Sequence, residues 1–526
     1  MKWIVFTLLA ASGCLGQERP DVFTIAGTAV DAVTAKPVQR ARIVLADSSS
    51  LVAELGSSIT AEDGRFQFTV ARGKFSLRAE RSGLAPQFYG AQALYSAFGV
   101  SIVAGPGQRT DNLIFRLFPP SAISGTVLDD GGEPVEDAVV QLLRSYVAAG
   151  RRTTMTMGWV RTNDLGEYRF GRLPAGSYYL AVTGAPWYAS SARLARAGAS
   201  ADTAMSHIAF APAYYANTGN PRAATSIQVK SGEEAVANFS LYPKSGHSIT
   251  VNCAECRSTR MRLDLTSEGI LGVPSSQRVV TFYGDTRIAA VPPGRYTVRV
   301  RNEDERKPIS AMAEVEVSSG DVVVSLSLQE AAKVTGTVAV RDGDRSLLTR
   351  LFVAVRNESE PNIGFTREVR PDGSFEVPVS LPGRYRMQIV GTRGVFASQV
   401  TSDDPAVRNG VIEIGSGAVR VNVVASNGVG RVKGFVRRGS EPTSGVLVVA
   451  APAGLPSDPG AYSSFETDSD GSFDFEQLRP GEYRLFALTD TEFEWANPES
   501  IRPYLDAAVA VHVEARSLIQ QDLELP

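Results

Sequence analysis

Three histidines are the first residues of this 526-residue chain to test for chemistry, because a catalytic zinc site needs several His and carboxylate ligands at fixed spacing. His207, His247 and His512 stand far apart, and none belongs to a His-Glu-x-x-His or His-x-x-Glu pattern. A Gly-x-Ser-x-Gly nucleophile elbow and a phosphate loop before a helix are also missing from the sequence. We therefore predict no catalytic residues, no metal site and no cofactor, and we expect that the protein is not an enzyme.

Two cysteines lie close together in the sequence CAEC, as Cys253 and Cys256. Zinc or redox chemistry would require a second cysteine pair or a nearby histidine, and neither follows. An oxidising compartment permits a disulfide across this short loop. We expect a possible disulfide or two unpaired thiols, with a metal or redox site as the less favoured alternative.

One acidic turn, DSDGSFD at residues 468–474, gathers three aspartates around a glycine. Hard cations such as Ca²⁺ prefer oxygen-rich turns of this kind. However, the glycine comes fourth rather than sixth, and no glutamate occupies the twelfth position of a calcium loop. A hairpin turn is therefore the favoured interpretation, and calcium binding is the alternative.

Aromatic residues could stack on a sugar ring, and they gather in one long loop, residues 184–220. The segments APWYASS and APAYYANTGNP place Trp187, Tyr188, Tyr214 and Tyr215 in this loop. Long loops in compact domains commonly carry function. These four residues are the candidate ligand platform, and the alternative is that their rings form the core of the loop. Phe493, Trp495 and Tyr504 form a smaller set of the same kind.

The bulk composition argues against nucleic acid and anionic lipid as partners. The net charge of −3 and the pI of about 5.9 give no basic field that would attract nucleic acid or anionic lipid.

The first 16 residues read as an export signal, with Lys2 before an apolar stretch too short to span a bilayer. Cleavage after Gly16 competes with a lipobox reading, in which the signal ends before Cys14 and Cys14 carries a lipid anchor. We expect no transmembrane segment in the mature chain, and we place the protein in the periplasm, at the outer-membrane surface or outside the cell.

A recurring phrase reveals the elements that would hold these residues. TDSDGSFDFEQLRPGEYRLFAL, residues 467–488, has close parallels beginning at Thr60, Thr162 and Val369, and a degenerate copy begins at Asp285. In each copy two alternating apolar runs, typical of half-buried strands, are joined by turns rich in Gly and Pro. The aromatic residue after the second turn recurs at intervals of 103, 118, 89 and 98 residues, and it falls at Phe75, Tyr178, Tyr296, Tyr385 and Tyr483. Such spacing indicates a tandem array of domain-sized repeats.

A second phrase, with Gly-x-Val followed by a polar turn and another strand, precedes four of the copies. Short alternating strands close the repeats, and helical periodicity is nearly absent. The sequence therefore predicts an all-β fold built as a tandem array of about five seven-stranded β-sandwich modules. We call them units one to five, and we place them at residues 21–118, 119–243, 244–329, 330–426 and 427–526. Short helices are expected only within residues 190–206 and 497–508.

The repeated residues resemble those of the carboxypeptidase regulatory-like domain, a transthyretin-like or starch-binding-like β-sandwich. In unit two the pattern falls on Thr162, Gly166, Tyr168, Phe170, Leu173, Pro174, Gly176 and Tyr178. In unit five it falls on Thr467, Asp468, Gly471, Phe473, Phe475, Leu478, Pro480, Gly481 and Tyr483. The match is weak in unit three. The resemblance implies a fold and no catalytic motif.

These observations together predict an exported, non-catalytic, multidomain binding or scaffold protein, with a polysaccharide or an envelope or extracellular protein as its partner. Protein–protein adhesion, or an accessory role in envelope or outer-membrane transport, is the alternative. A subunit that assists a peptidase is less favoured.

Overall fold

The computed structural model describes residues 21–48, 53–91, 99–189, 208–302, 308–341, 345–358, 363–415, 417–490 and 492–525. The described chain is built from β-strands in many separate sheets, with a few short helical turns, so the predicted all-β class is confirmed. Within these ranges, no helix has the length and apolar character that crossing a bilayer requires. The predicted export signal, including Cys14, lies outside the described residues.

Unit one consists of the sheet β4-β1-β8 facing a second sheet, β3-β2-β5, whose strand β5 also pairs with β6 and β7. Its strands are β1 (Phe23–Asp31), β2 (Arg42–Asp47), β3 (Glu54–Ile59), β4 (Arg65–Val70), β5 (Gly73–Arg81), β6 (Leu84–Phe88), β7 (Ile102–Ala104) and β8 (Leu113–Leu117).

Unit two repeats this arrangement with the sheets β12-β9-β17 and β11-β10-β13-β15, together with a two-stranded sheet, β14-β19. Its elements are β9 (Ser121–Asp129), β10 (Val139–Ala148), β11 (Arg151–Arg161), β12 (Glu167–Leu173), β13 (Gly176–Thr183), η1 (Trp187–Ala189), β14 (Ile208–Phe210), β15 (Ala213–Tyr214), η3 (Pro221–Ala223), β16 (Ile227–Val229), β17 (Glu234–Val236), β18 (Phe239–Leu241) and β19 (Pro243–Ser245).

Unit three has the sheets β23-β20-β26 and β22-β21-β24-β25-β27. Its elements are β20 (His247–Asn252), η4 (Ala254–Ser258), β21 (Met261–Ser267), η5 (Ile270–Gly272), β22 (Ser275–Phe282), β23 (Thr286–Val291), β24 (Gly294–Asn302), β25 (Ile309–Val317), β26 (Val322–Ser325) and β27 (Gln329–Glu330).

Unit four has the sheets β31-β28-β36-β33 and β30-β29-β32-β35-β34. Its elements are β28 (Ala332–Val340), η6 (Arg345–Arg350), β29 (Phe352–Asn357), β30 (Gly364–Glu368), β31 (Ser374–Val379), β32 (Gly383–Val390), β33 (Phe396–Thr401), β34 (Val407–Arg408), β35 (Val411–Ile414) and β36 (Ala418–Ser426).

Unit five has the sheet β38-β37-β41, with β44 and β45 also on β37, and the sheet β40-β39-β42-β43. Its elements are β37 (Gly430–Arg438), β38 (Glu441–Pro442), β39 (Leu447–Pro452), η7 (Pro459–Ala461), β40 (Ser463–Glu466), β41 (Ser472–Leu478), β42 (Gly481–Leu488), α2 (Pro498–Ile501), η8 (Arg502–Tyr504), β43 (Val509–Val513), β44 (Leu518–Gln520) and β45 (Leu523–Glu524). The helical turns α2 and η8 lie in the expected range 497–508, whereas residues 190–206 lie outside the described residues.

Five clusters of buried apolar residues fill the space between facing sheets, and each cluster draws its residues from one of the five units. The alternation read from the sequence explains this burial, since Phe473 and Phe475 are 1% and 5% exposed while their neighbours face solvent or the sheet surface. The exact number and limits of the units stay a prediction.

The glycine of the Gly-x-Val phrase has one structural role in four units. It lies opposite an aromatic residue on the neighbouring antiparallel strand, as in the pairs Gly125–Tyr168 and Gly434–Phe473. A parallel strand also crosses close to it, so that a Cβ on Gly434 would lie 1.8 Å from the carbonyl oxygen of Gln521. Only glycine leaves room for both neighbours. Unit three has no copy of the Gly-x-Val phrase, and its strand β20 instead pairs Ile249 with Ile288.

The threonine that opens the long phrase is equally specific. The buried Thr467 hydroxyl donates a hydrogen bond to the Thr443 carbonyl oxygen (2.9 Å) and accepts one from the Val446 amide (3.1 Å). The hydroxyl groups of Thr60 and Thr162 make the same pair of bonds in their own units. Each hydroxyl therefore satisfies two backbone groups of the turn between the first two strands of its unit.

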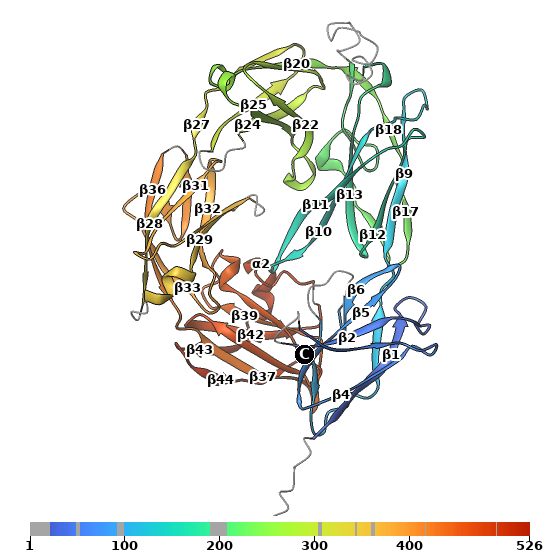
Figure 1. Ribbon diagram of the computed structural model, residues 1–526, viewed down its shortest axis with the longest axis vertical. Coiled ribbons are helices and arrows are strands. Elements are labelled where there is room, and N and C mark those ends of the chain that lie inside the picture. Colours follow the sequence, from blue (N-terminus) through green and yellow to red (C-terminus); the bar gives the residue numbers. More distant parts are fainter. Residues whose placement is uncertain are drawn as a thin grey trace, which may run out of the picture.

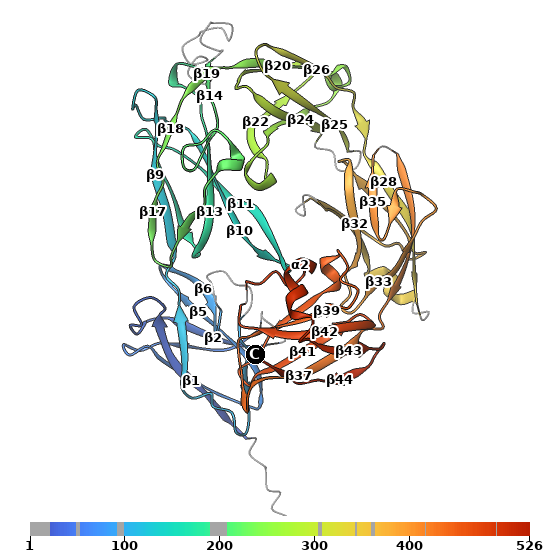
Figure 2. The same ribbon diagram turned by 180° about the vertical axis from the view of Figure 1, so that it is seen from behind.

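The units follow one another around a ring, so that unit five lies beside unit one (Figures 1 and 2). The hairpin of β10 and β11 also extends from unit two to the region of α2 in unit five. Residues far apart in the sequence therefore meet at the junctions between units.

Candidate functional site

The four aromatic residues of the proposed platform do not form one surface. Trp187 and Tyr188 lie on η1 with their ring centroids 5.6 Å apart in an edge-to-face arrangement, and Trp187 is 60% exposed. Tyr214 is only 2% exposed, and Tyr215 packs edge-on against Phe239 in the core of unit two. The structure thus separates Trp187, which is exposed, and Tyr188, which is half-buried, from Tyr214, which is buried, and Tyr215, which is half-buried against the core. Ligand binding by any of the four stays a prediction.

Tyr214 has a structural partner in unit three. It lies in β15, beside strand β13, and it packs in a small apolar cluster with Leu143 and with Ile270 of unit three. Its hydroxyl donates a 3.5 Å hydrogen bond to the Glu268 carbonyl oxygen, and burial raises the pKa of Tyr214. This ring therefore helps to join units two and three, a role that the spacing of aromatic residues did not indicate.

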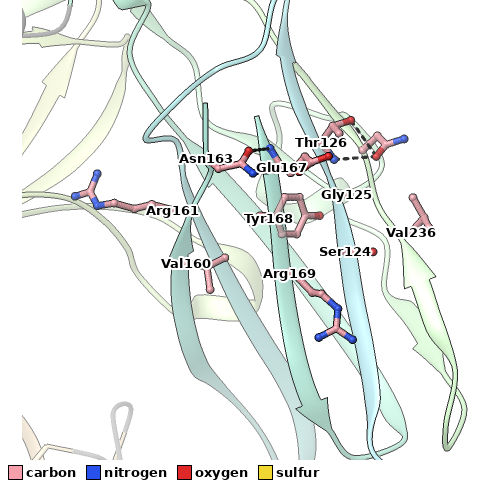
Figure 3. Close-up of a pocket in the computed structure, with 11 residues that line it drawn as sticks. Ser124, Gly125, Thr126, Val160, Arg161, Asn163, Glu167, Tyr168, Arg169 and Val236 are labelled. Atoms are coloured by element: carbon pink, nitrogen blue, oxygen red, sulfur yellow. Dashed lines mark hydrogen bonds between the residues drawn. The ribbon is translucent and has the colours of Figure 1, made fainter. Parts of the chain in front are cut away.

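A pocket of about 590 Å³ lies on unit two, lined by residues of β9, β11, β12 and β17 (Figure 3). The two sheets of the sandwich have their edge strands β11 and β12 on this side. The lining is Ser124, Gly125, Thr126, Val160, Arg161, Asn163, Glu167, Tyr168, Arg169, Val236 and Asn238. Sequence reasoning identified Tyr168 as a fold-forming residue but did not identify the pocket, because its walls come from strands that are separated in the chain.

The polar groups of this pocket are largely paired with other groups of unit two. Arg169 forms two hydrogen bonds to the Glu234 carboxylate, of 3.1 and 3.2 Å, and these lower the pKa of Glu234. The Glu167 amide donates to the Asn163 side-chain oxygen at 2.7 Å, as Figure 3 shows, and the Asn163 amide group donates to the Glu167 carboxylate at 3.0 Å. The buried Tyr168 hydroxyl donates to the Ala237 carbonyl oxygen at 2.6 Å, and burial raises its pKa. The pocket can offer hydrogen-bonding groups to a polar ligand, but its carboxylates already bind protein donors.

The candidate metal ligands are also used within the protein. Cys253 and Cys256 are joined by a disulfide, and both are fully buried. His512 Nδ1 lies 2.6 Å from a carboxylate oxygen of Glu482 at the surface, His247 begins β20, and His207 lies outside the described residues. In the part of the chain that the structure describes, no three His, Cys, Asp or Glu side chains are grouped as a metal site requires.

The three aspartates of the acidic turn point to different partners. Asp470 accepts a hydrogen bond from the Ser472 amide (3.0 Å), as expected of a turn residue. Asp474 pairs with Arg431 within unit five. Asp468 is 3% exposed and pairs with Lys74 of unit one. The turn connects β40 with β41, which lie in different sheets, so it is a tight turn between the two sheets and the predicted hairpin turn is wrong. Its glycine, Gly471, has the positive φ of +77° that the turn requires.

Trp159 and Trp495 occupy contrasting environments. Trp159 lies on edge strand β11 and is 58% exposed. Trp495 packs against the tip of the β10–β11 hairpin, where a Cβ on Gly150 would lie 2.5 Å from its ring. The Ala496 amide donates to the Gly150 carbonyl oxygen at 2.9 Å beside this contact. The aromatic group of unit five therefore takes part in a junction between units.

The fold and these surfaces define a multidomain β-sandwich protein. Residues 122–242 match the family model of the carboxypeptidase regulatory-like domain, so the chain contains a domain of this family in unit two. The resemblance inferred from the repeated phrase is thereby confirmed for that segment. No curated protein matches the sequence of this chain.

Several solved structures were found in a structural comparison. The TIE protein of Bacillus anthracis is 13% identical, with 77% of this chain and 75% of that chain covered and a TM-score of 0.18. A streptococcal ancillary pilin is 11% identical, with 58% and 98% covered and a TM-score of 0.18. The minor pilin GBS52 of Streptococcus agalactiae is 9% identical, with 42% and 96% covered and a TM-score of 0.21. Because these TM-scores are low, the similarities carry no argument about this chain.

Proposed function

We propose that this chain is an exported, non-catalytic binding or scaffold protein. The observation that supports it is that the residues repeated between units are occupied in forming the fold. In unit two the Thr162 hydroxyl serves two backbone groups, the Tyr178 hydroxyl donates to the Pro174 carbonyl oxygen, and Gly166 provides the turn at a φ of +71°. What differs between units is the loops and outer surfaces, which are the parts available to a partner.

A polysaccharide is the proposed ligand, and the exposed Trp187 with the half-buried Tyr188 beside it is its proposed contact. An indole ring that is 60% exposed offers an apolar face to the C–H groups of a sugar. Tyr214 and Tyr215 take a supporting role in this proposal, because their rings are engaged in packing. An aromatic contact of this kind contributes about 1 kcal/mol or more to binding.

Retention on immobilised polysaccharides tests this proposal, with thermal unfolding measured in parallel. We expect Trp187→Ala to lose retention while its unfolding temperature is unchanged. The matched control is Trp159→Ala, which removes an indole of nearly equal exposure (58%) from a different surface of the same unit. Tyr215→Ala should lower the unfolding temperature, because its ring packs against the core. Retention of Trp187→Ala equal to that of wild type and of the Trp159→Ala control would reject the proposed platform.

Hydrolytic activity provides a separate test. We expect the purified protein to cleave neither peptides nor glycosides in a metal-dependent manner. Chelator-sensitive hydrolysis of any such substrate would overturn the non-catalytic assignment.

An extracellular or envelope protein is the second candidate partner, and strand β11 favours it. This edge strand pairs only with β10 among the described strands, and Met157 and Trp159 are exposed along it. An exposed edge can accept an additional strand from a partner. Pull-down from envelope extracts, compared between wild type and a Trp159→Ala variant, distinguishes this candidate from polysaccharide binding.

Mass spectrometry of the mature N-terminus would decide between cleavage after Gly16 and lipidation at Cys14.

A further inference from the structure

Unit five carries the one copy of the repeated turn that has Asp-Ser before its Asp-Gly, at residues 468–471. We propose that this turn is a docking surface for unit one, and that their contact closes the array into a ring in solution. The proposal does not depend on the ligand or on the assigned function.

The first argument is backbone complementarity. Strand β7 is held on one side by β5, and its other edge carries the Val103 amide and the neighbouring Ser101 carbonyl. The Ser469 amide donates to the Ser101 carbonyl oxygen at 2.9 Å, and the Ser469 Oγ accepts from the Val103 amide at 2.9 Å. The turn of unit five therefore satisfies the edge of a strand in unit one, as an added strand would.

The second argument is charge. Lys74 lies on β5 opposite Val103, and its ammonium group binds both the Asp468 carboxylate and, at 3.4 Å, the Ser472 hydroxyl. Asp468 is 3% exposed, and burial raises its pKa although Lys74 opposes part of this effect. A carboxylate that loses its water needs a cation as partner. Unit one supplies that cation.

The third argument is the comparison with the other copies of the turn. The position of Asp468 is held by Ala61 in unit one, Asn163 in unit two and Arg370 in unit four, and all three are exposed. Among the described residues, the Asn163 side chain forms its hydrogen bonds within its own turn, to Leu165 and Glu167. The turn therefore folds without an acid at this position, so folding of the turn does not explain Asp468. Docking against Lys74 of unit one explains why an acid occupies this position.

Two other junctions hold unit five in the same place. From unit two, Arg151 donates to the carbonyl oxygens of Ala496 (3.1 Å) and Ser457 (2.6 Å) at the tip of the β10–β11 hairpin. From unit four, the Gly394 amide donates to the Gln477 side chain at 2.9 Å. Closure thus requires no further movement of the neighbouring units.

A disulfide cross-link in the full mature chain tests the proposal. Ser101→Cys with Ser469→Cys joins two positions linked by a backbone hydrogen bond, which suits disulfide geometry. We expect mild oxidation to give a faster-migrating monomer on a non-reducing gel, with the linked peptides identified by mass spectrometry. The matched control is Ser57→Cys with Ser469→Cys, since β3 lies three strands from β7, roughly 14 Å away and beyond disulfide reach. Absence of the intrachain link, an equal yield in the control, or disulfide-linked dimers in its place would overturn closure within one chain.

Substitution of Lys74 tests the charge argument in the cross-linking background. Lys74→Ala leaves Asp468 buried without its cation, so the intrachain link should form about tenfold more slowly, as expected for loss of a charge-assisted hydrogen bond. Lys36→Ala removes an exposed lysine of the same unit and should leave the rate unchanged. Circular dichroism verifies that the Lys74 variant is folded. An unchanged rate in a folded Lys74→Ala chain would reject Lys74–Asp468 as part of the docking surface.

Discussion

Replacement of Gly434 by alanine should disrupt unit five more than most single changes. Gly434 lies in β37, opposite Phe473 on β41 and next to the chain that joins β44 and β45. A Cβ there would lie 1.8 Å from the Gln521 carbonyl oxygen and 3.1 Å from the Phe473 ring. Because the nearer neighbour is backbone, rotation of a side chain cannot relieve the overlap.

The cost follows from the movement required. To reach a tolerable separation of 3.0 Å from a Cβ now at 1.8 Å, the Gln521 carbonyl must shift by 1.2 Å. Two hydrogen bonds depend on its present position, from the Gln521 amide to the Lys433 carbonyl oxygen (2.9 Å) and from the Phe435 amide to Asp522 (3.0 Å). At about 1 kcal/mol each, with a further ~1 kcal/mol for crowding of the Phe473 ring, the loss is about 3 kcal/mol.

Native-state hydrogen exchange on the full chain measures this loss locally, because a protein of several domains does not unfold as one unit. Amides of β37 and β41 should exchange roughly a hundredfold faster in Gly434→Ala, as about 3 kcal/mol implies. The control is Gly454→Ala, where no heavy atom lies within 4 Å of the added Cβ, and exchange should stay close to that of wild type. Rates in Gly434→Ala within fivefold of the control would show that the close crossing does not constrain this position.

Three further predictions concern the turns of unit five. Gly471→Ala should lower the stability of unit five by about 2–3 kcal/mol, because a positive φ (+77°) is combined with a contact of the added Cβ to Pro442 at 2.8 Å. Gly481→Ala, with a φ of +152° and open space around the added Cβ, should lower it by about 1 kcal/mol. Equal hydrogen-exchange rates in the two variants would contradict this ranking. Thr467→Val should lower stability by about 1–3 kcal/mol, because it leaves two buried backbone groups without their hydroxyl partner. Amide exchange in β39 and β40 should become faster, and unchanged exchange there would contradict this prediction. The pKa of Asp468 is raised above 3.8 in the folded state, so ionisation of this carboxyl opposes folding. Its contribution to the free energy of unfolding is therefore fully present below pH 3.8 and is lost as the pH rises through the raised pKa. Thermal unfolding at pH 3.5 and pH 7 should therefore show wild type losing stability toward pH 7 relative to Asp468→Asn, and the opposite trend would refute the sign of the shift.

Much of the fold could be predicted because it depends on residues close together in the sequence. A turn is specified by four consecutive residues, and a half-buried strand by alternation, so 467–488 could be read as turn, strand, turn and strand. The role of the Gly-x-Val glycine required the structure, since the aromatic ring and the carbonyl that exclude a side chain at Gly434 come from residues 39 and 87 positions later.

The candidate site was harder to predict because exposure is a tertiary property. Trp187 and Tyr214 are both aromatic residues of one long loop, yet Trp187 is 60% exposed and Tyr214 is 2% exposed. The difference arises because unit three covers Tyr214 with Ile270, and no local pattern encodes that contact. The pocket of Figure 3 is also assembled from four separated strands.

The sequence by itself determined the class of fold, the repeating sandwich and the positions of its turns, because these follow from short-range backbone preferences and the alternation of apolar residues. Tertiary structure alone decided how the units meet. Asp468 reads in the sequence as part of an oxygen-rich turn, but its carboxylate binds Lys74, which is 394 residues earlier in the chain. A buried charge must find an opposite charge wherever the folded chain places one, and that position depends on the packing of all the intervening units.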